Sequence, residues 1–235
     1  MERVGTVEEL WRYPVKSMGG ERCRVLEVDE RGVAGDRRYA VRDEQGRLGS
    51  GKSTLRFTQL DGLLEYAAAL TDTVPEIRCP DGHVFRADDP ELHRLLSGRF
   101  GRPVSVAPER DVSHMDAAPL HLLTTASLNW IEQQQGSVAA DVRRFRPNLV
   151  LKTDGAGLEE HAWPGFRLRI GEALEVLVVD TTERCRMVTL AQGNLAEVPG
   201  LLRRIGLDAG LQFGVYADVL SPGPIRAGDP VYRFT

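Results

Sequence analysis

The stretch LEVLVVD at residues 174–180, followed by TTERCRM at residues 181–187, decides the fold of this chain. A short apolar run rich in valine is typical of a buried β-strand. The run leads into a polar turn, where Cys185 lies between Arg184 and Arg186. Neighbouring positive charge favours the thiolate, which is the form of cysteine that acts as nucleophile and metal ligand. The alternative is an ordinary small buried side chain, as most free cysteines are.

Further short strands are expected on both sides of this stretch. Residues 166–170 and 173–179 flank Gly171-Glu172, a pattern typical of a hairpin with a two-residue turn. The other expected strands cover residues 4–15, 22–28, 38–42, 120–123, 149–151, 213–220 and 230–234. Helices do not alternate with these strands, which argues against a doubly wound parallel sheet. The sequence therefore predicts a mainly β protein with a few short helices (α+β), built from antiparallel sheets that close into a barrel.

The helices have recognisable ends. Asp89 can cap a helix that starts at Pro90, and Gly98 can end it. Thr124 or Thr125 can cap a second helix that stops near Gly136. Shorter helices are expected at residues 139–144 and at residues 197–205, the latter ended by Gly206.

Length and composition limit the class of protein. A chain of 235 residues is long enough for one large or two small domains. Residues 99–110, rich in glycine, proline and charge, suggest a division into domains 1–105 and 106–235. A net charge of -4 argues against a nucleic-acid partner, and no apolar run is long enough for a membrane span. The three cysteines do not have the spacing of a zinc site, and the N-terminus lacks the apolar core of a signal peptide. These two observations predict a cytoplasmic protein.

The segment GRLGSGKS at residues 46–53 matches the phosphate-binding P-loop pattern. A P-loop must follow a buried strand and open a helix whose N-terminus faces phosphate. The residues before it, 42–45, are charged, and residues 55–58 are as typical of a strand as of a helix. Two interpretations remain: a nucleotide-binding enzyme that uses Lys52, or a glycine-rich loop between strands that helps to bind an anion.

Several motifs occur in a fixed order along nearly the whole chain. They are YPVKS at 13–17, GDR at 35–37, HLLTTASL at 121–128, FRPN at 145–148, RC at 184–185, FGVY at 213–216, and SPG at 221–223 with GDPV at 228–231. In this order they resemble the MOSC domain family. The resemblance is strongest to two-part members related to the mitochondrial amidoxime-reducing component. In these, an N-terminal MOSC-associated β-barrel domain, here residues 1–105, precedes the MOSC domain, here residues 106–235.

The resemblance implies a site for a molybdenum–molybdopterin cofactor. Cys185 matches the family cysteine whose sulfur ligates molybdenum, and Asp116 matches an acidic residue near the metal with a catalytic role. The positions that match cofactor contacts are Lys16, Ser17 and Arg37 at the phosphate end, with Arg146, Asn148 and Tyr216. These residue types suit the chemistry, because guanidinium, ammonium and hydroxyl groups bind phosphate and a soft thiolate suits the metal. Taken singly, each is an ordinary surface charge, turn residue or core residue.

The implied function is a reductase of N-hydroxylated compounds such as hydroxylamines, amidoximes or N-hydroxylated bases. The N–O bond breaks and water leaves. No cysteine follows Cys185, so a C-terminal iron–sulfur cluster is excluded and a separate ferredoxin- or flavoprotein-like electron donor is expected. The alternative is a cofactor carrier without turnover. The chain departs from the family pattern at Thr182, where many relatives have a second cysteine, and at residues 190–193, where an acidic Asp-Pro stretch is common.

Overall fold

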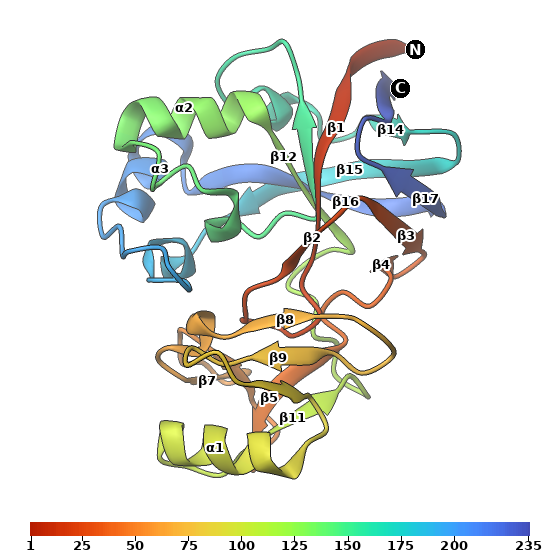
Figure 1. Ribbon diagram of the computed structural model, residues 1–235. Coiled ribbons are helices and arrows are strands. Elements are labelled where there is room, and N and C mark those ends of the chain that lie inside the picture. Colours follow the sequence, from red (N-terminus) through yellow and green to blue (C-terminus); the bar gives the residue numbers. More distant parts are fainter.

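The larger sheet of the structure closes on itself. The computed structural model describes all residues, 1–235. Seven strands follow one another in the order β13-β12-β16-β15-β14-β18-β1, and β1 pairs back onto β13 (Figure 1). All neighbours in this barrel are antiparallel except β12 and β13. The prediction of a mainly β protein with a barrel is therefore confirmed. The strands are β1 (Glu2–Arg12), β12 (Leu120–Thr124), β13 (Leu149–Lys152), β14 (Arg167–Ile170), β15 (Leu174–Glu183), β16 (Gln212–Ser221) and β18 (Pro230–Phe234).

Strand β15 shows why the barrel closes. Leu174, Val176 and Val178 alternate with less buried residues and contribute to the core that fills the barrel. This alternation leaves one face of the strand for the interior. The connection from β14 to β15 has three residues, 171–173, because Ile170 pairs with Leu174. The predicted two-residue turn is therefore one residue too short, although Gly171 adopts the positive φ of 64° that favours glycine.

A smaller unit lies at one end of the molecule, below the barrel in Figure 1. Its core includes Val41, Ile77, Leu92 and Leu96. One sheet of the unit contains β11 (Val104–Pro108), β5 (Tyr39–Asp43), β6 (Leu48–Ser50) and β7 (Phe57–Gln59). A second contains β10 (Val84–Arg86), β9 (Glu76–Arg78) and β8 (Ala67–Ala69).

Helix α1 (Pro90–Phe100) covers this smaller core. Asp89 caps it as predicted, accepting a hydrogen bond from the Glu91 N–H at 2.8 Å. The predicted end at Gly98 is wrong, because the helix continues to Phe100 and ends at Gly101, whose φ is 64°. A glycine inside a helix costs about 1 kcal/mol, which the buried leucines of the helix outweigh.

Two helices pack beside the barrel. Helix α2 (Thr125–Gln135) begins at Thr124, whose hydroxyl accepts from the Ser127 N–H at 3.1 Å, and it ends at Gly136. Helix α3 (Leu201–Ala209) begins and ends four residues later than predicted, because Gly210, not Gly206, takes the left-handed conformation. The predicted short helix at 139–144 is confined to the 3-10 helix η2 (Val142–Arg144).

The remaining elements are short. They are β2 (Glu21–Cys23), β3 (Val25–Asp29), β4 (Gly32–Val33) and β17 (Gly223–Arg226), with the 3-10 helices η1 (Leu63–Glu65), η3 (Glu159–Ala162) and η4 (Arg186–Thr189). None of the helices has both the length and the apolar character that a membrane crossing requires.

The segment that matches a P-loop does not have P-loop structure. Residues 48–50 form strand β6, which pairs in parallel with β7, and no helix follows Lys52. The nucleotide-binding interpretation lacks its structural basis. The segment instead consists of strand β6 with the end of the turn before it and the start of the loop that leads to β7.

Strand β1 belongs to the barrel, although it precedes the smaller unit in the sequence. It pairs with β13 and with β18, at the far end of the chain. Residues from both ends of the chain therefore form one sheet. The proposed division into residues 1–105 and 106–235 remains a prediction, in which the first strand would pack with the second domain.

Candidate functional site

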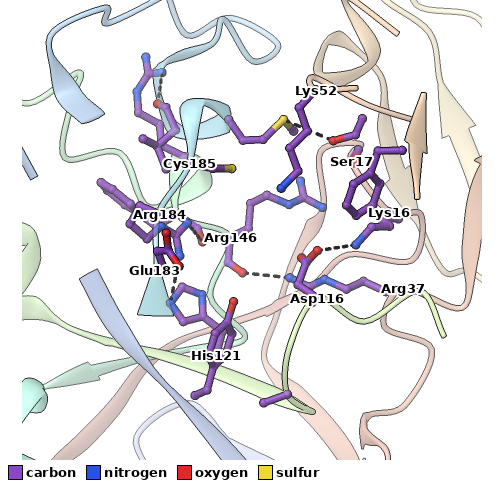
Figure 2. A pocket seen from close by; sticks show the side chains of 18 of the residues that line it. Lys16, Ser17, Arg37, Lys52, Asp116, His121, Arg146, Glu183, Arg184 and Cys185 are labelled. Atoms are coloured by element: carbon purple, nitrogen blue, oxygen red, sulfur yellow. Dashed lines mark hydrogen bonds and ion pairs between the residues drawn. The ribbon is translucent and has the colours of Figure 1, made fainter. Parts of the chain in front are cut away.

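A cavity of about 280 Å³ lies between the barrel and the smaller unit. All eight residues that the sequence predicted for a cofactor site line it: Lys16, Ser17, Arg37, Asp116, Arg146, Asn148, Cys185 and Tyr216. Figure 2 labels all of these except Asn148 and Tyr216. They come from six separate segments, so only the tertiary fold brings them together. The structure places these residues around one space, and their roles there remain proposals.

Cys185 lies at the end of the stretch with which the sequence analysis begins. It lies two residues after the end of strand β15 and directly precedes the short helix η4. Its side chain is partly exposed and forms no disulfide. The thiol is therefore accessible from the cavity, unlike that of the buried Cys79.

Three of the predicted residues have an unusual backbone. Only four residues other than glycine have a positive φ, and three of these are Ser17, Arg37 and Arg146, at 63°, 50° and 56°. Such conformations cost of order 1 kcal/mol or more and gather at functional sites, where the surrounding structure enforces them. The strain supports the view that these three positions are built for a ligand.

Arg37 and Arg146 lie over the same buried ring. Their guanidinium carbons lie 5.2 Å and 4.3 Å from the centre of Tyr13. Arg37 pairs with the fully buried Asp36, and Arg146 donates to the carbonyl of Met18. Burial, with Arg37 nearby, lowers the pKa of Arg146 to about 10. Both groups remain cationic at neutral pH.

Lys16 and Asp116 form an ion pair at the cavity. The Lys16 Nζ lies 2.6 Å from the Asp116 carboxylate and donates to the His114 carbonyl at 2.8 Å. Lys16 is 4% exposed, whereas Asp116 is 56% exposed. Desolvation by the surrounding cavity walls, although the side chain is half exposed, acts to raise the pKa of Asp116, but the charges of Lys16 and then Arg37 hold it well below its ordinary value. Asp116 is therefore ionised at neutral pH.

Asn148 and Tyr216 border the cavity from the barrel side. Asn148 Oδ1 accepts from the His121 N–H at 3.2 Å, and its amide nitrogen donates to the Trp11 carbonyl at 3.4 Å. Tyr216, on β16, lies 5.7 Å from the His121 ring, centre to centre. Burial, followed by the charge of Arg184, holds the pKa of His121 well below its ordinary value. The His121 ring is therefore neutral.

Several cavity residues were not among the predicted site residues. They are Ser50, Lys52, Phe57, Ala118, His121, Arg144, Phe145, Glu183, Arg184, Met187 and Val188. His121, Phe145 and Arg184 lie within the family motifs and could have been found there. Lys52 was considered only as part of a P-loop. Arg144 is fully buried and donates to four backbone carbonyls, which only the fold reveals.

The charge of the cavity suits an anion. Six cationic side chains and two carboxylates line it, whereas the chain as a whole has a net charge of -4. Two buried guanidinium nitrogens, Nη2 of Arg146 and Nε of Arg184, have no hydrogen-bond partner. A buried donor without an acceptor is costly, so these atoms point to a ligand that supplies one. The residues present thus fit a phosphate-bearing cofactor, with the Cys185 sulfur available to its metal.

Comparison with known proteins gives two family matches. Residues 4–86 match the MOSC N-terminal beta barrel domain, and residues 109–232 match the MOSC domain. The chain is 26% identical to mitochondrial amidoxime reducing component 2 of Rattus norvegicus and 25% identical to that of Homo sapiens. Both alignments cover 99% of this chain and 84% of the relative. Among solved structures, it is similar to the YUAD protein from Bacillus subtilis, with a TM-score of 0.49, 14% identity and coverage of 97% and 93%.

Proposed function

Because this chain belongs to the MOSC domain family, we propose that it holds a molybdenum–molybdopterin cofactor in the cavity and reduces N-hydroxylated compounds. The domain itself is molybdenum-cofactor-related, and the relatives are named amidoxime reducing components. The observation that carries the proposal is the convergence of Cys185 with unpartnered guanidinium nitrogens in one cationic cavity.

The cationic residues would hold the cofactor's phosphate end. Lys16, Arg37 and Arg146 lie together around the cavity, and the Ser17 hydroxyl adds a donor. Guanidinium groups bind phosphate through paired hydrogen bonds, and an ammonium binds it as a point charge. Cys185 would bind the metal through its sulfur, and Asn148 and Tyr216 would border the bound group. When bound, the cofactor supplies the two electrons of the reaction.

The overall reaction consumes two electrons and two protons. The nitrogen–oxygen bond of R–NH–OH breaks, giving R–NH₂ and water. The chain's own residues would exclude bulk water and orient the substrate, and a separate donor protein would deliver the electrons to the bound cofactor. A carboxylate with the low pKa of Asp116 carries no proton at neutral pH. We therefore propose that Asp116 positions the Lys16 ammonium, and the catalytic role that the family resemblance implies for Asp116 remains a prediction.

The decisive experiment measures molybdenum and pterin in protein purified from a host that makes the cofactor. Wild type is expected to hold about one molybdenum per chain. Cys185→Ala is expected to lose the metal or change its coordination spectrum, whereas the control Cys23→Ala, outside the cavity, retains it. Wild type without metal or pterin would contradict the proposal. Metal without reduction of any N-hydroxylated compound, whatever the electron donor, would show a carrier instead of an enzyme.

A further inference from the structure

Lys52 is the cavity cation that forms no hydrogen bond with the protein. The other five cationic side chains each donate a hydrogen bond to a protein oxygen. The Lys52 ammonium forms neither a hydrogen bond nor an ion pair, and the contact that it does make is with the face of the Phe57 ring, 5.1 Å from its centre. Its charge is therefore available to a ligand in the cavity.

The Phe57 ring is shared by three cations. Lys16 Nζ lies 5.4 Å from its centre and the Arg56 guanidinium carbon 5.2 Å, alongside Lys52. Lys16 and Arg56 each donate to protein oxygens, so their charges are partly compensated. One ring cannot offset the repulsion among three cations, and an anion close to Lys52 would reduce it.

The backbone beside Lys52 is fixed against the segment that follows Cys185. The Gly51 N–H donates to the sulfur of Met187 at 3.2 Å. A Cβ at position 51 would lie 2.6 Å from that sulfur and 2.5 Å from Leu190 Cδ1, so a larger residue would have to displace these two side chains. The P-loop-like segment thus holds Lys52 at the side of the cavity where Cys185 lies.

Lys52 shares the Phe57 ring with Lys16 but, unlike Lys16, has no protein partner for its ammonium group. Figure 2 shows its side chain directed into the cavity, between Cys185 and the Lys16–Asp116 pair. We infer that Lys52 binds an anionic substituent of the substrate, so that the site prefers N-hydroxylated compounds that carry a carboxylate. This inference rests on the proposed function of the cavity. A lysine is suited to the role, because its flexible stem and point charge accept anions of varied shape.

The test compares an amidoxime that bears a ring carboxylate with its neutral methyl ester. Turnover of both compounds and equilibrium binding of both by calorimetry are measured for wild type, Lys52→Met and Lys52→Arg. Lys152→Met is the matched control, because Lys152 is exposed on β13 outside the cavity. Molybdenum and pterin contents are measured for every variant.

Wild type is expected to bind the carboxylate at least tenfold more tightly than the ester, and less so at high salt. Lys52→Met should weaken carboxylate binding by about tenfold to a hundredfold, the range for a hydrogen bond to a charged group. Its metal content and ester turnover should be unchanged, and Lys52→Arg should retain most of the preference. Equal binding of both compounds by wild type would overturn the inference, as would loss of metal or pterin in Lys52→Met.

These results separate the inference from the proposed function. If wild type reduces neither compound but still prefers the carboxylate through Lys52, the reductase proposal fails and the anion site stands. If both compounds are reduced without a charge preference, the reductase proposal stands and the inference about Lys52 fails.

Discussion

Replacing Asp36 by asparagine tests whether the site depends on a carboxylate that no ligand would touch. Asp36 is fully buried. Its Oδ1 accepts from the Tyr13 N–H at 2.7 Å, and its Oδ2 pairs with Arg37. Asparagine can retain the bond to Tyr13 but removes the negative charge that faces the guanidinium. Arg37 would then keep only its bond to the Arg146 carbonyl, at 3.3 Å.

The expected loss is large for a substitution that changes so few atoms. Removing one partner of a buried ion pair costs about 3–5 kcal/mol, because the other charge remains buried and uncompensated. Of the nearby carboxylates only Asp116 would still oppose the charge of Arg37, while Arg146, over the same Tyr13 ring, would repel it. We therefore expect Asp36→Asn to lower the free energy of unfolding by about 3 kcal/mol, and Asp36→Ala by somewhat more because it also loses the bond to Tyr13.

Urea unfolding of the metal-free protein measures this effect. The matched control is Asp88→Asn, which breaks the exposed Arg86–Asp88 pair and should cost about 0–1 kcal/mol. Inorganic phosphate should restore part of the stability of Asp36→Asn, because it can neutralise Arg37. If Asp36→Asn unfolds within 1 kcal/mol of the Asp88 control, the buried pair does not hold Arg37 in place and the reasoning is wrong.

Two further predictions concern the barrel and its helices. Burial raises the pKa of Glu160, although the hydroxyls of Thr124 and Ser127 donate hydrogen bonds to its carboxylate. The folded protein therefore favours the protonated side chain. The contribution of Glu160 to stability is greatest below the pKa of the unfolded state and is lost as pH rises through the pKa of the folded state. The stability of Glu160→Gln relative to wild type, from urea unfolding between pH 5 and 8, should therefore rise with pH, and a flat difference would contradict this. Gly214→Ala should lower the free energy of unfolding by several kcal/mol, because a Cβ at this φ of 85° would lie 2.8 Å from the carbonyl oxygen of Leu122. Gly82→Ala is the control, because Gly82 has a φ of 92° but open space around it. It should show only the backbone strain of about 1–3 kcal/mol. Similar losses in the two glycine variants would refute the close contact.

Local signals in the sequence located the elements of the fold better than their ends. Asp89 and Thr124 each cap a helix as predicted, because a side-chain acceptor and the first free N–H groups are local in sequence. The C-terminal ends of α1 and α3 were misplaced because two glycines lie near each of them, and either glycine could end the helix. Packing decides between them, and Gly101 and Gly210 are the ones in the left-handed conformation.

The candidate site was predictable as far as its residues lie in ordered motifs. Lys16 and Cys185, far apart in sequence, line one cavity as expected. Their partners were not predictable, since Lys16 bonds a carbonyl 98 residues away. The position of Lys52 depends likewise on the contact between Gly51 and Met187. Such contacts depend on how the smaller unit docks on the barrel, which motif spacing does not describe.

The pairing of β1 with β18 has a consequence for how the protein is made. Glu2 lies opposite Arg233, so the edge of the first strand that pairs with β18 has no partner until residues 230–234 have left the ribosome. Contacts between residues so far apart in sequence slow folding. Until β18 is in place, the unpaired edge of β1 can bind a chaperone or pair with a wrong strand. Tyr216 also joins the cavity only late in synthesis. The proposed cofactor would therefore enter after these strands have paired, as an insertion into an assembled barrel and not as a nucleus for folding.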